Sequence, residues 1–180
     1  MACIWEPLYD RYYGDNAPLR ELLTVHSRLV ADKSLAIAAA HPELGLDTCF
    51  LEEAAMLHDI GIFLTDAAPI HCFGTYSYIC HGYLGADLLR SEGLPRHALV
   101  AERHTGTGLT IDEILKRDLP VPHRDMTPQS PEEQVVCFAD KFFSKTRPTQ
   151  EKTVEQAERS LLKFGEDGII TFRRWCGLFL

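Results

Sequence analysis

Helical periodicity constrains the fold of this chain more than any other feature, because apolar residues recur every three or four positions along most of it. Strand-like alternation is nearly absent. The chain has 180 residues, of which 46% are hydrophobic, and this is enough to bury a sizeable core. The sequence therefore predicts an all-α protein, a compact helical bundle that forms a single domain over residues 1–180.

Caps and glycines predict where the helices begin and end. The first long helix should run from near Pro18 to about Ala40, and the second from the Asp47 cap to His58 and Asp59, where Gly61 indicates a break. Further helices are expected at about 78–91, 95–104, 153–164 and 169–180. Capping boxes are expected at Thr110 with Glu113, Ser130 with Glu133, and Thr153 with Gln156. Segment 65–76 should be a loop, and the proline-rich segment 119–131 a surface excursion that can wall a site.

Charge and composition exclude several classes of function. With 18 basic and 26 acidic side chains the net charge is −8, which opposes binding to nucleic acid or to an anionic membrane surface. No apolar run approaches the roughly 20 residues of a membrane span, and the first residues lack the pattern of a secretory leader. The six cysteines are scattered singly, without a C-x-x-C pair. We therefore expect a cytoplasmic protein with reduced thiols and a small-molecule substrate.

Six polar side chains interrupt the apolar stripes of five predicted helices. His58, for example, shares a stripe with Leu51 and Ala54. Each histidine taken alone could be an ordinary core residue with a hydrogen-bond partner. Six imidazole and carboxylate groups that all face inward would be costly to desolvate separately, whereas together they suit one or two metal ions in the core of a bundle. These candidate ligands are His26, His58, Asp59, His81, His104 and Asp140.

The spacing of these residues resembles the HD-domain superfamily of metal-dependent phosphohydrolases, from about Val25 to Lys145. The family signature is a histidine, then a His-Asp doublet after an apolar helix, then a distant aspartate, and here it matches His26, His58-Asp59 and Asp140. The doublet stands in the HDIG form, and His81 and His104 occupy the places of extra ligands in dinuclear members. The segments around His81, His104 and Asp140 are most similar to the bacterial enzymes that split diadenosine tetraphosphate symmetrically.

This resemblance implies an HD-domain bundle whose motif-bearing core spans about residues 18–147, with C-terminal helices at 153–180 packed on it. It implies two divalent or trivalent ions, iron, manganese or zinc, in a dinuclear metal site. One ion would be held by His26, His58 and Asp140, the other by His81 and His104, with Asp59 bridging both. A metal-activated hydroxide would then hydrolyse a phosphate ester or anhydride, with a nucleotide or dinucleoside polyphosphate as the expected substrate.

Two departures narrow the resemblance. Ile62 follows Gly61 where many HDIG members have a lysine, so the phosphate contact of that lysine is either absent here or supplied by another residue. The Gly-Tyr-Pro continuation of the cyclic-di-GMP phosphodiesterases is missing, which argues against that substrate.

Candidate substrate-binding residues follow from the charge that a phosphate carries. Lys141 and Arg103 adjoin candidate ligands and are assigned catalytic roles together with Asp59. Each cation could equally be a solvated surface residue. His71 and His123 are possible acids toward the leaving group, although ordinary polar loop residues explain them as well. The candidate substrate-binding set is Lys33, Lys141, Lys145, Arg103, His71, Thr105 and Gly106.

Two other functions remain open at this stage. The same ligands resemble those of di-iron oxygenases on the HD scaffold, the inositol and aminophosphonate types. A metal- or nucleotide-sensing module is the third class, and it is disfavoured because every ligand position is filled. The sequence leaves the oligomeric state open.

Overall fold

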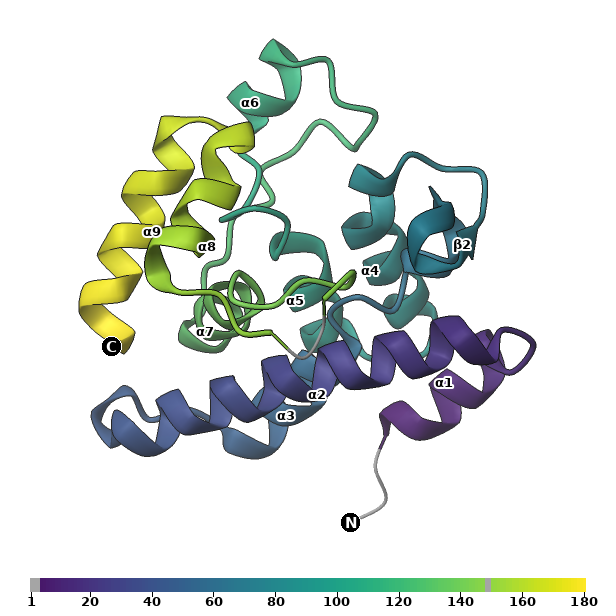
Figure 1. Ribbon diagram of the computed structural model, residues 1–180, viewed down its shortest axis with the longest axis horizontal. Helices are drawn as coiled ribbons and strands as arrows, with labels where there is room; N and C mark the ends of the chain where they lie inside the picture. The colour runs from purple at the N-terminus through teal and green to yellow at the C-terminus, as the bar shows by residue number, and fades with distance from the viewer. Residues whose placement is uncertain (1–3, 148–149) are drawn as a thin grey trace.

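The computed structural model describes residues 4–147 and 150–180, and these are almost entirely helical (Figure 1). The α-helices are α1 (Trp5–Tyr13), α2 (Ala17–Ala40), α3 (Thr48–Leu57), α4 (His81–Ser91), α5 (Pro95–Arg103), α6 (Ile111–Lys116), α7 (Pro131–Asp140), α8 (Val154–Leu161) and α9 (Glu166–Phe179). Short 3₁₀ turns are η1 (Pro42–Leu44), η2 (Ile62–Leu64), η3 (Ala68–Ile70), η4 (Tyr78–Cys80) and η5 (Leu162–Phe164). Among the described residues, β1 (Asp66–Ala67) and β2 (Cys72–Phe73) form a small antiparallel pair.

The long helix α2 organises the centre of the fold. Its first turn is capped by the side chain of Asn16, which accepts a hydrogen bond from the Leu19 amide. The helix then packs along α3 and α7 (Figure 1). Helix α5 contacts both α3 and α7, and α4 packs against α5. Buried apolar side chains from α1–α5 and α7–α9 join in one core that includes Leu23, Leu51 and Phe138, whereas Ile114 of α6 belongs to a smaller cluster. The predicted all-α class is confirmed.

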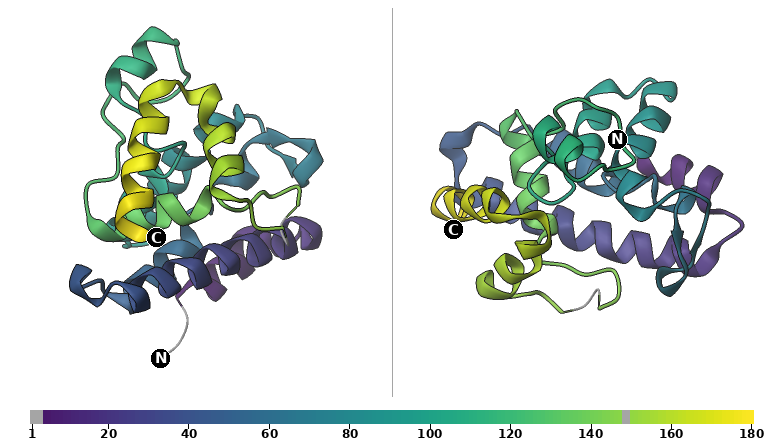
Figure 2. Two further views of the ribbon diagram at one scale, coloured as in Figure 1. Left: turned by 60° about the vertical axis from the view of Figure 1, so that its left-hand side comes forward. Right: turned by 90° about the horizontal axis from the view of Figure 1, so that it is seen from above.

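Helix α9 packs against α7, and α8 packs against α9 at the C-terminal, yellow end of the chain (Figure 2). Aromatic rings seal this contact: Phe138 lies 5.3 Å from Phe172 and 6.5 Å from Trp175, measured between ring centroids. Phe172 and Trp175 are buried. This arrangement brings α8 and η5 to the side of the bundle on which α7 ends.

Several predicted boundaries hold and others need correction. Helices α2 and α5 begin and end within one residue of expectation, and the capping boxes at Thr110 and Thr153 are present. Helix α3 begins as expected but ends at Leu57, just before the expected end at His58 and Asp59. At Ser130 only half of the box forms, because the Glu133 side chain instead pairs with Arg103 and accepts from the Gln129 amide. Helix α9 begins at 166 rather than 169, and the expected loop 65–76 contains the short strand pair. Helix α1 was not predicted.

Segment 119–131 is irregular, as expected. It is held on the bundle by Arg124, whose guanidinium pairs with the buried carboxylate of Glu102 in α5. Its residues do not line the pocket described below, so its expected role as a site wall is not met. No helix in 4–147 or 150–180 is both long and apolar enough to cross a membrane.

Candidate metal centre

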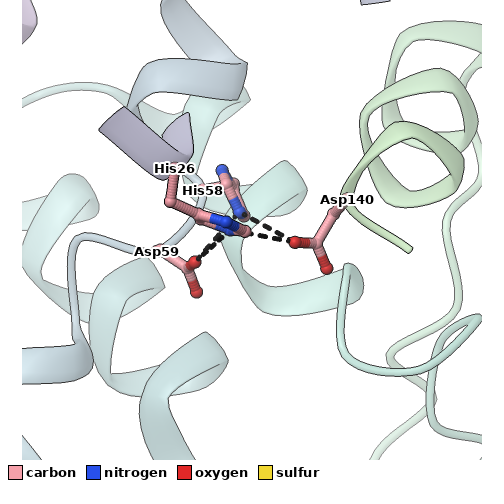
Figure 3. Close-up of side chains that lie close together, drawn as sticks. All are labelled: His26, His58, Asp59 and Asp140. Atoms are coloured by element: carbon pink, nitrogen blue, oxygen red, sulfur yellow. Dashed lines mark ion pairs between the residues drawn. The ribbon is translucent and has the colours of Figure 1, made fainter. Parts of the chain in front are cut away.

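Three elements bring four of the candidate ligands together. His26 lies in the middle of α2, His58 and Asp59 directly follow α3, and Asp140 is the last residue of α7 (Figure 3). The Nε2 atom of His26 lies 3.2 Å from Oδ2 of Asp59 and 3.1 Å from Oδ1 of Asp140. The Nε2 atom of His58 lies 3.1 Å and 3.6 Å from the same two oxygens. Two imidazoles and two carboxylates thus surround one point in the core.

A second group forms on the other oxygen of Asp59. Its Oδ1 atom lies 3.4 Å from Nε2 of His81 and 3.3 Å from Nε2 of His104. The two Nε2 atoms are 3.0 Å apart. Asp59 is therefore shared, with one carboxylate oxygen facing each group. This is the division of ligands that the family resemblance implies.

The donor atoms fit metal ions. Three imidazoles donate a hydrogen bond from Nδ1 to the carbonyl three residues earlier, at 2.6 Å for His58 to Ala55, 2.6 Å for His81 to Tyr78 and 2.8 Å for His104 to Ala101. Each ring is thereby fixed with Nε2 facing the centre. Both oxygens of Asp59 and the Nε2 atoms of His26 and His58 are buried without a hydrogen bond. Apart from the ion pair of Asp59 with Lys145, these buried groups converge with few hydrogen bonds, which suits them to a shared cation.

The glycine of the HDIG motif is required by the approach of α4. A Cβ atom on Gly61 would lie 2.3 Å from the carbonyl oxygen of His81 and 2.4 Å from the amide nitrogen of Gly85. Any side chain at this position would push α4 outward and move His81 away from Asp59. The absence of a side chain at Gly61 thus lets α4 pack close enough to place His81 beside Asp59.

Two tyrosines of α1 support the turn that carries the doublet. Tyr13 donates a hydrogen bond of 2.6 Å to the carbonyl of Ile60, and Tyr9 donates one to the carbonyl of Met56. Both rings are buried, and burial raises the pKa of both phenols, so they remain donors. Sequence analysis did not identify them, although their spacing of four residues on an apolar face is a usable signal.

The buried charges are balanced locally. Burial would raise the pKa of Asp59, but Lys145 and His58 outweigh it and hold that pKa well below its usual range. Lys141 acts in the same way on the pKa of Asp140, with its Nζ 2.8 Å from Oδ2. Burial would lower the pKa of His58, but the two carboxylates raise it to about 9. Both aspartates therefore stay ionised and available as ligands at neutral pH.

The second group differs in its electrostatics. Burial, with the neighbouring His104 ring, lowers the pKa of His81 to about 3. Burial also lowers the pKa of His104. These two imidazoles are therefore neutral at physiological pH, which is the state that binds a metal.

A pocket of about 390 Å³ opens beside the two groups. Its inner end is formed by His81, His104 and Asp140, and the Nζ atom of Lys141 is fixed there by a 3.0 Å hydrogen bond to the His104 carbonyl. The structure thus brings four of the predicted substrate-binding residues to the pocket: Lys141, Lys145, Thr105 and Gly106. The pocket also contains residues that sequence analysis missed, namely Tyr78, Arg117, Lys152, Lys163 and Phe164.

Three predicted substrate residues lie elsewhere. Arg103 points to Glu133, with which it forms an ion pair of 2.8 Å, so its assignment as a catalytic and substrate-binding residue is corrected. Lys33 pairs with Glu151 at 2.7 Å and covers the ring of Phe142. His71 is exposed on the turn before β2, outside the pocket. Their sequence positions suggested proximity to the site, but partners distant in sequence or an exposed turn direct these side chains away.

Of the two candidate acids toward the leaving group, neither lines the pocket. His123 is exposed in the segment 119–131, like His71 in its own turn. The structure therefore favours the simpler interpretation of both as polar loop residues.

Comparisons with known proteins agree with this geometry. The family model described as "HD domain" matches residues 24–144. An uncharacterized protein of Methanocaldococcus jannaschii is 31% identical over 131 residues, which are 72% of this chain and 70% of that protein. The tRNA (cytidine(56)-2'-O)-methyltransferase of Picrophilus torridus is 31% identical over 128 residues, which are 71% of this chain but 33% of that protein.

The same methyltransferase of Thermoplasma volcanium is 33% identical over 62% of this chain and 29% of its own length, so this chain spans about a third of those two proteins. The crystal structure of the HD domain of the L. monocytogenes phosphodiesterase PgpH superposes with a TM-score of 0.59. That match covers 96% of this chain and 86% of the other at 20% sequence identity, and it supports the fold. With its signature residues gathered in one buried centre and most of its length matched by the family model, the chain belongs to the HD-domain family.

Proposed function

We propose that this protein is a metal-dependent phosphohydrolase that cleaves a phosphate ester or anhydride of a small soluble substrate, a nucleotide or dinucleoside polyphosphate. One observation carries the proposal: two groups of ligands share Asp59 and open directly onto a pocket that contains lysines. Metal ions held by these ligands would neutralise the charge of a phosphoryl group during cleavage, and the lysines can bind its oxygens. The proposed setting is the cytoplasm, and the proposed partner a small molecule rather than a nucleic acid.

Each ligand has a distinct role in this proposal. His26, His58 and Asp140 would hold one ion and His81 and His104 the other, and each oxygen of Asp59 would serve one of the two groups. When bound, the ions supply the Lewis acidity that activates a water molecule and neutralises charge on the phosphoryl group. The candidate ligands combine imidazole and carboxylate donors, and this mixture suits iron, manganese or zinc ions.

The two inner lysines bind the substrate in this proposal. Lys141 is fixed at the inner end of the pocket by the His104 carbonyl, so its ammonium group can contact a phosphoryl oxygen next to the ligands. Lys145 lies against Asp59 in the same wall. Both side chains are shielded from solvent, with exposed fractions of 8% and 13%, which strengthens their attraction for a phosphate.

The extent of the domain is part of the same proposal. We take residues 1–180 as one HD domain, with a motif-bearing core at about 18–147 and the C-terminal helices packed on it. The aromatic contact between Phe138 and Phe172 supports this unit. The name of the L. monocytogenes relative supports phosphodiester chemistry, whereas methyl transfer is no part of the proposal because that match covers a third of the methyltransferases.

The decisive experiment combines metal analysis with a substrate screen. Protein purified without oxygen should contain up to two ions per chain and release phosphate or a nucleotide from one class among nucleotides, dinucleoside polyphosphates and sugar phosphates. Hydrolysis without oxygen supports the proposal. Oxygen consumption with a mixed-valence iron signal, and no phosphate release, would establish the di-iron oxygenase instead.

A further inference from the structure

The pocket extends outward from the candidate metal centre to three more cations. Arg117 directly follows α6, Lys152 precedes α8, and Lys163 lies in η5, and all three line the same pocket as His104 and Lys141. Lys152 and Lys163 come after the segment that the family model matches. The outer end of the pocket is thus built largely by chain that the family signature does not describe.

These three cations differ from the inner lysines in their surroundings. Within the described residues no ion pair of 4.0 Å or less involves Arg117, Lys152 or Lys163, whereas Lys141 and Lys145 pair with Asp140 and Asp59. Acidic side chains do lie nearby, but they serve other contacts or stay farther away. Glu113 caps α6, and Glu166 and Asp167 line an adjacent surface hollow that Arg117 and Lys163 also line, without an ion pair to either cation. Three unpaired cations in a protein of net charge −8 form a local reversal of charge.

Lys152 is the most constrained of the three. It is partly buried, and its Nζ donates a 3.2 Å hydrogen bond to the carbonyl of Lys141. Burial lowers its pKa, and the positive charges of Lys141 and Lys163 act in the same direction against the attraction of Asp140. Lys152 therefore lies between the inner lysines and the outer cations, where a bound anion would offset the repulsion among their positive charges.

Phe164 joins the outer cations to the wall of the pocket. The guanidinium carbon of Arg117 lies 6.0 Å from the centre of its ring, and Nζ of Lys163 lies 5.0 Å from it. The ring also covers Gly106, where an added Cβ would lie 3.2 Å from it. The outer cations thus have a fixed support beside the turn that carries His104.

We propose that Arg117, Lys152 and Lys163 form an outer anion subsite that takes a second phosphate group of the substrate, while the scissile phosphate lies at the metal centre. This inference rests on the proposed function and specifies its substrate class: a molecule with at least two phosphate groups, such as one with a polyphosphate chain. A simple monophosphate ester fills only the inner end. The subsite governs binding of the substrate and takes no part in bond cleavage.

Calorimetric titration of the metal-free full chain with inorganic tripolyphosphate and with inorganic phosphate tests the subsite without catalysis. In this state the inner lysines are paired with carboxylates, so binding reports mainly the outer cations. Tripolyphosphate should bind at least about tenfold more tightly than phosphate, and Lys152→Gln with Lys163→Gln should remove about tenfold of that affinity. Arg174→Gln, an exposed arginine of α9 outside the pocket, is the matched control.

The outcomes separate this inference from the proposed function. Unchanged tripolyphosphate affinity in the Lys152→Gln, Lys163→Gln double variant would overturn the subsite. So would unchanged affinity in a second double variant that combines Lys163→Gln with Arg117→Gln. So would a single-stranded RNA that competes at lower concentration than tripolyphosphate, because the subsite would then serve a nucleic acid. With a hydrolysed diphosphate substrate, the double variant should raise KM about tenfold and leave kcat nearly unchanged. Lys-dependent tripolyphosphate binding without any hydrolysis would contradict the proposed function alone.

Discussion

The two ends of the pocket treat charge in opposite ways. At the inner end Lys141 and Lys145 each pair with an aspartate, and these groups are shielded from solvent. At the outer end Arg117 and Lys163 are exposed and unpaired among the described residues, and they come from short or irregular segments. The inner end therefore presents lone pairs suited to cations, and the outer end presents positive charge suited to anions. A phosphorylated substrate complexed at a metal centre needs both.

The largest expected effect comes from the one residue that belongs to both groups of ligands. Asp59→Asn keeps the volume of the side chain but removes its charge, so in the proposed arrangement both ions would lose the carboxylate that they share. We expect loss of both ions and a fall in hydrolysis on the order of a thousandfold. Metal content by mass spectrometry and initial rates of phosphate release measure the two effects.

The control for Asp59 is Asp15→Asn, an exposed aspartate between α1 and α2. It should retain both metal and activity. If Asp59→Asn keeps two ions and appreciable activity, the bridging role and the mechanism that depends on it are wrong.

A pair of histidine variants separates the two groups of ligands. His26→Gln should deplete the ion held with His58 and Asp140, and His104→Gln the ion held with His81, so each variant should retain about one ion per chain. Each should lose on the order of a hundredfold in activity. Reconstituted protein that never exceeds one ion per chain, with unaltered activity in His104→Gln, would show that the second group is structural.

The two groups should also differ in their response to pH. His58 has a pKa of about 9 because Asp59 and Asp140 outweigh its burial, so below that pH it carries a proton that an ion must displace. His81, with a pKa of about 3, has no such proton to lose. Affinity at the first group should therefore rise up to about tenfold per pH unit between pH 7 and 8.

Calorimetry in buffers of different ionisation enthalpy measures this release directly. We expect binding of an ion to release about one proton at the first group and none at the second. The His104→Gln variant, which retains the first group, measures the former, and His26→Gln, which retains the second group, measures the latter. Equal proton release from both variants would contradict the assignment of His58 as the protonated member.

The inner end could be predicted from sequence because it lies on regular helices. His26 and His58 interrupt apolar stripes, and helical periodicity alone places such residues inward. The convergence of these candidate ligands in the core could thus be anticipated with the HD resemblance. Boundaries such as the Asn16 and Asp47 caps followed from local hydrogen bonding and were equally accessible.

The outer end could not be predicted, for a physical reason. Arg117, Lys152 and Lys163 are separated by up to 46 positions, and a charged residue near a helix end is by default a solvated one. Their convergence depends on how α8 and η5 pack, which no local pattern encodes. The same limitation misassigned Arg103, because its partner Glu133 lies 30 positions away and outside any helical repeat.

A smaller effect is expected at the support beneath the inner end. Tyr13→Phe removes the hydroxyl that donates to the Ile60 carbonyl and leaves that buried carbonyl without this partner. We expect a loss of about 1–2 kcal/mol in the free energy of unfolding, measured by urea denaturation. Tyr76→Phe, on an exposed ring, should change it by less than about 0.5 kcal/mol. Equal free energies of unfolding in the two variants would show that the Tyr13 hydroxyl does not stabilise the His58-Asp59 turn.

The smallest effect is expected for Lys33, a lysine that shares the stripe of His26 but not its surroundings. Its ammonium group lies 2.7 Å from Glu151 and 4.1 Å from the centre of the Phe142 ring, so it faces away from the pocket. An ion pair that is partly open to solvent contributes about 1 kcal/mol or less. Lys33→Gln should therefore change KM and kcat by less than about twofold, whereas Lys145→Gln, whose Nζ faces Asp59, should weaken substrate binding about tenfold or more. Comparable losses in both variants would mean that position on a helical stripe, rather than the partner across the fold, decides which lysine reaches the substrate.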